Sequence, residues 1–142
     1  PGGVEKWIRG WRKEQIAKGH ILTEPAPALL TTAYAEDVVN GYQEASKWVK
    51  LACERHLNDL KRSQEDPTFV WKFDPKKAWR PIRFIEQKCR PSKGDATKLV
   101  LQPFQHFFIG CIFGWVHKKT GIRRFTEALV FLGRKNGRRF AV

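Results

Sequence analysis

The residues with the clearest potential for chemistry lie near the end of the chain, in the run Gly133-Arg134-Lys135-Asn136-Gly137. They directly follow five apolar residues, 128–132. A continuous apolar run bounded by turn signals is typical of a fully buried strand of a parallel sheet. A phosphate-binding loop begins with a glycine-rich basic loop after such a strand, because glycines let successive N–H groups point at an anion. The pattern predicts either this loop or an ordinary strand followed by a basic turn.

The run departs from the standard phosphate-loop pattern, G-x-x-x-x-G-K-[ST], at three positions. Counting back from Gly137, Leu132 stands at the first glycine, Arg138 at the lysine and Arg139 at the Ser/Thr. The lysine normally reaches the β/γ-phosphates, and the hydroxyl holds Mg²⁺. Arginine keeps the positive charge but is a bulky planar fork, and it cannot coordinate a cation.

A second chemical signal lies upstream, in Leu101-Gln102-Pro103-Phe104-Gln105. The carboxamide of Gln105 offers a donor and an acceptor side by side, which matches the edge of adenine. The alternative is a polar residue at a helix start, which is common. We expect Pro103 to open a helix to about His117, apolar nearly all round and therefore buried on both sides.

Charge and length limit the class of protein. The chain has 142 residues, a one-domain length, and 42% of them are apolar, so it can bury a core. A net charge of +13 and a pI of about 10.1 favour a polyanionic partner, nucleic acid first and an acidic protein second. The alternative is a merely soluble basic surface. The candidate DNA-binding residues are Lys76, Lys77, Arg80, Arg83, Lys88, Arg90, Arg123 and Arg124.

Several classes of site and location are not expected. Three widely spaced cysteines, Cys53, Cys89 and Cys111, indicate neither a disulfide framework nor a zinc site, and we expect buried thiols in a reducing compartment and no metal. The longest apolar run, 107–116, is shorter than the roughly 20 residues of a membrane span. No secretory signal is visible, and methionine is absent, which fits a trimmed initiator or a fragment.

The hydrophobic pattern predicts a mainly α-helical chain. We expect an amphipathic helix over 4–19, whose tryptophans contact nucleic acid or a partner protein or dock on the body, and then a linker or extended loop over 20–32. A long helix follows over about 33–62, with His56 as a hydrogen-bonded core residue, and 69–73 is a short extended segment. Asp74 and Pro75 start a helix that is kinked or restarts at Pro81, with one face formed by Ala78, Ile82, Ile85 and Cys89. Residues 91–97 form a loop, where we place a domain boundary.

The segments 101–105 and 125–137 together resemble the entry to the ATPase centre of the large terminase subunit of tailed double-stranded DNA phages. The run F-D-P-K-K-A-W-R-P-I-R-F-I-E also resembles the region before that centre. The family has an atypical phosphate loop, with an arginine soon after the strand and then N-G-K-S or a similar ending, so Leu132 fits it. The resemblance implies that Gln105 contacts adenine and Arg134 senses or stabilises the γ-phosphate. The implied nucleotide-binding residues are Gln105, Gly133, Arg134, Lys135, Asn136, Gly137 and Arg138.

The resemblance also implies an overall organisation and a function. Residues 1–97 would form a helical N-terminal region, and 98–142 the incomplete start of a P-loop-type α/β ATPase domain. The chain would be the N-terminal portion of a DNA-packaging motor in the cytoplasm of the bacterial host. Its cofactors would be ATP and Mg²⁺, although Arg138 and Arg139 oppose their binding here, and its partners double-stranded DNA, the small terminase subunit and the portal. The alternative is a non-enzymatic basic helical module that binds DNA or an assembly partner and interferes with packaging.

We predict no ATP hydrolysis by this chain, although the family is an ATPase and endonuclease. Arg139 cannot supply the Mg²⁺ hydroxyl, Arg138 is a poor substitute for the phosphate lysine, and the acidic residue of a later strand is absent. Arg138→Lys with Arg139→Ser repairs only the two local defects, so it should strengthen nucleotide binding without creating turnover. Measuring phosphate release from Mg-ATP by the wild type and by the double variant checks both predictions. Turnover by the double variant alone would show that a carboxylate within these residues, such as Glu127, holds the metal.

Overall fold

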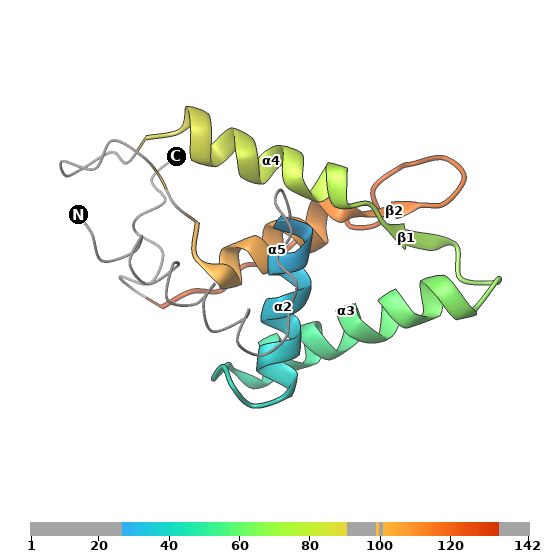
Figure 1. Ribbon diagram of the computed structural model, residues 1–142, viewed down its shortest axis with the longest axis horizontal. Helices are drawn as coiled ribbons and strands as arrows, with labels where there is room; N and C mark the ends of the chain where they lie inside the picture. Colours follow the sequence, from blue (N-terminus) through green and yellow to red (C-terminus); the bar gives the residue numbers. More distant parts are fainter. Residues whose placement is uncertain (1–26, 91–98, 100, 134–142) are drawn as a thin grey trace.

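The computed structural model describes residues 27–90, 99 and 101–133, and within them the chain is mainly helical. The expected mainly α fold is thereby confirmed, and the expected helix over 4–19 lies outside the described residues. The elements, in chain order, are α2 (Pro27–Val39), α3 (Lys47–Glu65), β1 (Trp71–Phe73), α4 (Pro75–Lys88), α5 (Pro103–Gly114) and β2 (Trp115–His117) (Figure 1).

The prediction of one long helix over 33–62 is wrong, because the structure has two helices there. Helix α2 begins at Pro27, inside the expected linker, since proline is well suited to the first helical position. It ends before Asn40 and Gly41, and Gly41 has a φ of 80°, a left-handed conformation that glycine adopts without strain. Helix α3 starts afresh after Ser46, whose Oγ accepts a hydrogen bond from the N–H of Val49.

The segment from β1 to α4 follows its sequence signals. The extended segment expected at 69–73 contains β1, and Asp74 Oδ1 accepts from the N–H of Lys76 at 3.0 Å, so the predicted N-cap is confirmed. Helix α4 runs through Pro81 without restarting. Of its predicted apolar face, Ala78 and Ile82 are fully buried and the other two members are partly buried.

Helix α5 is shorter than expected, since it ends at Gly114 and residues 115–117 form a strand. Trp115 pairs with Phe73 and His117 with Trp71, in an antiparallel two-stranded sheet. Aromatic and β-branched residues suit strands, and here β1 supplies the hydrogen-bonding partner. The chain then turns back through Gly121, and Arg123 forms an isolated bridge with Val116.

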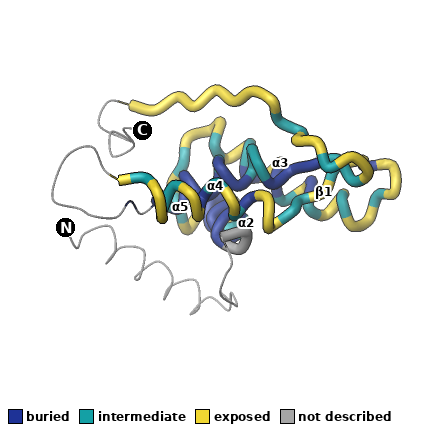
Figure 2. The backbone as a smooth tube through the Cα atoms, turned by 90° about the horizontal axis from the view of Figure 1, so that it is seen from above, coloured by how far each residue is buried: buried dark blue, intermediate teal, exposed yellow. Residues whose placement is uncertain are grey.

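Helix α5 is the centre of the described fold. In Figure 1, α2 and α5 lie between α4 on one side and α3 on the other, and the small sheet lies at one end. Phe107 of α5 contributes to a cluster with Tyr34, Val38 and Cys53, and Ile109 to a second cluster with Ile82, Leu99 and Leu101. Figure 2 shows that burial concentrates along these central segments. The expected burial of this helix on both sides is confirmed.

Two glycines let α5 approach its neighbours closely. A Cβ on Gly110 would overlap the Oγ1 of Thr31, a buried hydroxyl that donates to the carbonyl of His106 at 3.0 Å. A Cβ on Gly114 would overlap the ring of Phe73, and the Gly114 carbonyl accepts from the N–H of Asp74 at 2.7 Å. Any larger residue at these positions would push the helix off α2 or off the turn before α4.

His56 joins α3 to the rest of the core, as expected for a hydrogen-bonded core histidine. It is 2% exposed, and its Nδ1 accepts a 3.1 Å hydrogen bond from the indole N–H of Trp115. Its Nε2 lies 3.3 Å from the hydroxyl of Thr32, and its ring packs edge-on against Phe73 and Phe107. Burial lowers the pKa of His56 from 6.5 to about 4, against the raising influence of Asp59.

The buried strand expected at 128–132 is wrong within this structure. These residues form neither strand nor helix, and Leu129 and Phe131 are 92% and 93% exposed. Figure 2 shows the segment leading toward the C-terminus as an exposed run beside the helices. The physical reason is that a parallel strand needs neighbouring strands on its flanks, and the short β1–β2 sheet offers it none. The expected P-loop-type α/β sheet is not formed by the described residues.

We expect His56 to make stability fall as the solution is acidified. The unfolded histidine takes up a proton near pH 6.5 and the folded one only near pH 4, so its contribution is complete above about pH 6.5 and is lost progressively down to about pH 4. The total loss in the free energy of unfolding should be on the order of 3 kcal/mol. Urea denaturation of the wild type and of His56→Gln between pH 7 and pH 4 measures it. Parallel curves for the two proteins would contradict the prediction.

Candidate functional site

The first turn of α5 carries the proposed adenine-contacting residue, Gln105. Its side chain is turned back on the helix end: Oε1 accepts from the N–H of Gln102 at 2.6 Å, and the residue is 2% exposed. Pro103 occupies the first helical position, where its missing N–H costs nothing. In this arrangement Gln105 is a helix cap, so a contact between its amide and an adenine would require this bond to open.

Glu86 of α4 holds the same end of α5 in place. Its Oε1 accepts from the N–H of Leu101 at 3.3 Å and lies 3.2 Å from Nε2 of His106. His106 is 5% exposed, and its other ring nitrogen, Nδ1, is buried and has no hydrogen-bond partner among the described residues. The start of α5 is therefore fixed from outside by a carboxylate and from inside by its own glutamine.

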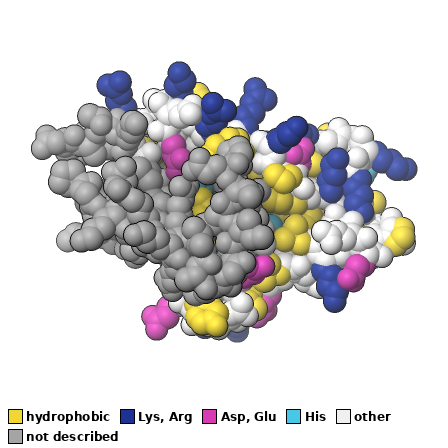
Figure 3. Space-filling view, viewed as in Figure 1, with side chains coloured by type: hydrophobic (Ala, Val, Ile, Leu, Met, Phe, Trp, Pro, Cys, Tyr) yellow, Lys and Arg dark blue, Asp and Glu magenta, His cyan; other side chains and the backbone are white. Residues whose placement is uncertain are grey.

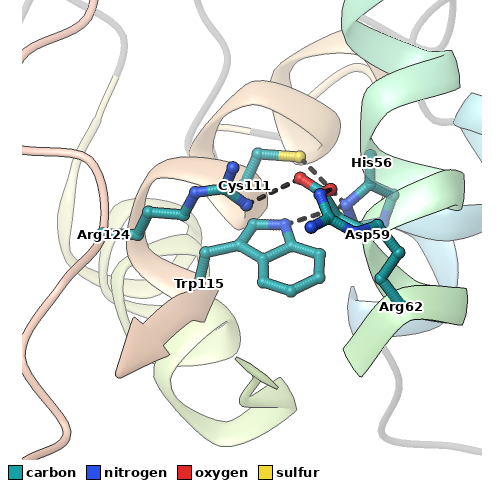
Figure 4. Close-up of polar contacts among 6 residues, drawn as sticks. All are labelled: His56, Asp59, Arg62, Cys111, Trp115 and Arg124. Carbon is teal, nitrogen blue, oxygen red and sulfur yellow. Dashed lines mark hydrogen bonds and ion pairs between the residues drawn. The ribbon is translucent and has the colours of Figure 1, made fainter. Parts of the chain in front are cut away.

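Arg124 anchors the segment that leads toward the predicted phosphate loop (Figure 4). Its guanidinium donates to Asp59 Oδ2 of α3 at 2.6 Å, and the two side chains are 20% and 6% exposed. Its carbon Cζ lies 5.6–5.9 Å from the ring centroids of Phe69, Trp71 and Trp115, within cation–π range.

The anchor of Arg124 is continuous with the core. Trp115, one of the rings beneath the guanidinium, donates to His56, and the sulfur of Cys111 lies 3.5 Å from the same Nδ1 of that histidine (Figure 4). Asp59 also lies 3.7 Å from Arg62, a partly exposed cation one turn along α3. Although Arg124 was a candidate for DNA binding, its guanidinium is committed to an internal ion pair.

The predicted loop itself is mostly beyond what the structure describes. Gly133 is exposed and is the last described residue, while Arg134, Lys135, Asn136, Gly137, Arg138 and Arg139 lie outside the described residues. Within the described ranges, no group of His, Cys, Asp or Glu side chains is suited to hold a metal ion. No helix in the described part is long and apolar enough to cross a membrane.

Of the other candidate DNA-binding residues, five lie on α4, Arg90 follows the end of that helix, and Arg123 follows β2. Figure 3 shows Lys and Arg side chains along the edge over this helix and on toward the sheet. Lys77 Nζ donates to the carbonyl of Gly121 at 2.8 Å, which ties the β2 turn to the start of α4. Arg123, beside that turn, is exposed and stacks 5.0 Å from the ring centroid of Phe113. The exposed cations of this surface are Lys76, Lys77, Arg80, Arg83, Lys88, Arg90 and Arg123.

Asp59 was missed by the sequence interpretation, and so was its pairing with Arg124. The only available signal was a carboxylate on the apolar side of a helical pattern, one turn after His56, since a buried charge requires a partner. Nothing in the sequence identifies a partner 65 residues away.

Comparison with known proteins shows what the last part of the chain is similar to. Residues 103–142 match the family model described as terminase large subunit, ATPase domain, which confirms the resemblance to the large terminase subunit. The match begins at the first residue of α5 and includes β2, the turn and the segment after Arg124. No curated protein and no solved structure matches the chain.

We predict that Arg124→Ala destabilises the fold by about 3 kcal/mol, because it leaves a buried carboxylate without its closest partner. Arg62→Ala is the matched control, since Arg62 is 49% exposed and lies farther from the same carboxylate, and it should cost less than about 1 kcal/mol. Urea denaturation of the three proteins at neutral pH measures both changes. Equal losses in the two variants would show that Arg124 is no more important than a surface cation.

Proposed function

We propose that this chain is the N-terminal portion of a phage DNA-packaging terminase large subunit. The observation that carries the proposal is the family match over the segment that starts with α5 and ends with the basic loop. In this proposal the helical body positions α5, and Arg124 sets the direction in which the chain leaves the body toward the loop. The small terminase subunit and the portal are the protein partners that the resemblance implies.

The nucleotide part of the proposal concerns ATP with Mg²⁺, which would supply the energy of packaging. The side chain of Gln105 would need to release the N–H of Gln102 before it could contact an adenine. The described residues contain no cluster of side chains suited to hold a metal ion. The loop residues with Arg134 would meet the phosphates. Because Arg138 and Arg139 occupy the lysine and hydroxyl positions, we propose that this chain does not hydrolyse ATP by itself.

The DNA part of the proposal rests on the cationic face of α4. Five of its cations project from α4, and no carboxylate in the described part of the chain pairs with them. Such a face attracts phosphates of any sequence, since contacts to the DNA backbone carry no base information. The same face would serve the second candidate, a non-enzymatic module that binds DNA without ATP. Nucleotide binding by the chain distinguishes the two.

We predict weak, sequence-independent binding of double-stranded DNA. If about five phosphates are contacted, the logarithm of affinity should fall against the logarithm of salt with a slope of about −4 to −5. Arg80→Gln and Lys88→Gln should each reduce the slope by about 1. Lys50→Gln is the control, because it removes the same charge from the exposed side of α3. Fluorescence anisotropy over a salt series gives the slopes, and a flat response would sink the DNA proposal.

A further inference from the structure

One side chain on the cationic face of α4 is not a cation. Phe84 is 61% exposed, although it is among the largest apolar side chains of the chain. It follows Arg80 by four residues and precedes Lys88 by four, and Lys77 lies seven residues before it. Residues at these spacings share one stripe of a helix, and each step of four advances about 6 Å along the axis. The aromatic ring therefore stands in line with cations on both sides.

This stripe is free of negative charge. The one carboxylate of α4 belongs to Glu86, which faces the opposite way and holds the start of α5 through Leu101 and His106. The buried residues Ala78 and Ile82 occupy the inner face, so the ring of Phe84 cannot be a displaced member of the core. A ligand that contacts both the ring and the cations would explain why Phe84 is exposed in this row.

We propose that Phe84 stacks on an unpaired base of DNA while the flanking cations hold the phosphates on either side of that base. The inference rests on the proposed DNA binding and adds to it a preference for single-stranded extensions over intact duplex. In an intact duplex the faces of the bases are stacked on each other, so an apolar ring meets only hydrated phosphates and gains nothing. An unpaired base exposes its flat face to an aromatic side chain. Because every base has such a face, this stacking does not depend on the sequence.

The geometry favours a strand over an acidic peptide as the occupant. The cations lie before and after the ring along a single line. This arrangement matches an extended single strand, in which a phosphate lies on each side of every base. A peptide would need an apolar pocket to receive the ring, and the adjoining residues of this face, Arg83 and Gln87, are polar and exposed.

The experiment measures the affinity of the whole chain for three labelled probes at one salt concentration. The probes are a blunt duplex, the same duplex with a single-stranded extension, and the single strand alone. The wild type should bind the extended duplex more tightly than the blunt one. Phe84→Ala should weaken binding to the extended duplex about tenfold and leave the blunt duplex unchanged. Trp48→Ala is the control, because Trp48 is an aromatic residue 75% exposed on α3.

The variants separate the outcomes. Phe84→Tyr keeps a stacking ring and should retain the preference, whereas Phe84→Leu keeps apolar bulk and should lose it. Retention of the preference by Phe84→Leu would overturn base stacking in favour of a plain apolar contact. Equal affinity of the wild type for blunt and extended duplexes would overturn this inference and leave the proposed DNA binding intact. Failure to bind any probe at low salt would contradict both the stacking inference and the proposed DNA binding. Circular dichroism of each variant checks that the helices are retained.

Discussion

The need to cover α5 on every side determines the arrangement of the other elements. A helix with apolar residues all round has no face that water can solvate favourably, so neighbours must surround it. Helix α2 lies against Gly110, α4 supplies Ile82 and Glu86, and α3 reaches the helix through His56. Burying Phe107 and Ile109 contributes about 1.5–3 kcal/mol each, which is a large share of the stability of a domain of this size.

The same helix joins the two parts into which the sequence divides the chain. The division at residues 97 and 98 stays a prediction, since most of that loop lies outside the described residues. On the described side, however, α5 shares one hydrophobic cluster with α2 and α3 and another with α4. Arg124 then fastens the following segment to α3 through Asp59. The start of the family match is therefore packed into the helical body that precedes it.

Local signals in the sequence predicted the elements that depend on local chemistry. The Asp74 cap, the buried face of α4 and the helix after Pro103 are settled by neighbours in sequence. The apolar periodicity also placed His56 in the core, although its hydrogen-bond partner Trp115 is distant in sequence. The break between α2 and α3 was also signalled, by Asn40-Gly41, but a long apolar periodicity masked it. What could not be predicted depends on distant partners. Strand β2 forms because β1 lies beside it, whereas no strand in the described part of the chain lies beside residues 128–132. The burial of Gln105 also depends on the packing of the whole fold, which no spacing reveals.

The three cysteines occupy chemically different environments. Cys53 is fully buried, and burial raises its thiol pKa to about 12; burial also raises the pKa of Cys111, whose sulfur lies against His56. The thiolate is the form that attacks alkylating reagents, so the raised pKa values protect both sulfurs as long as the core is intact. Cys89 and Cys111 are both partly covered, but Cys89 lies at the end of α4, whereas the sulfur of Cys111 is turned toward the core against His56. A maleimide dye should therefore enter at this one position without mutagenesis, one residue beyond Lys88, and protection of the other two thiols reports on the integrity of the fold.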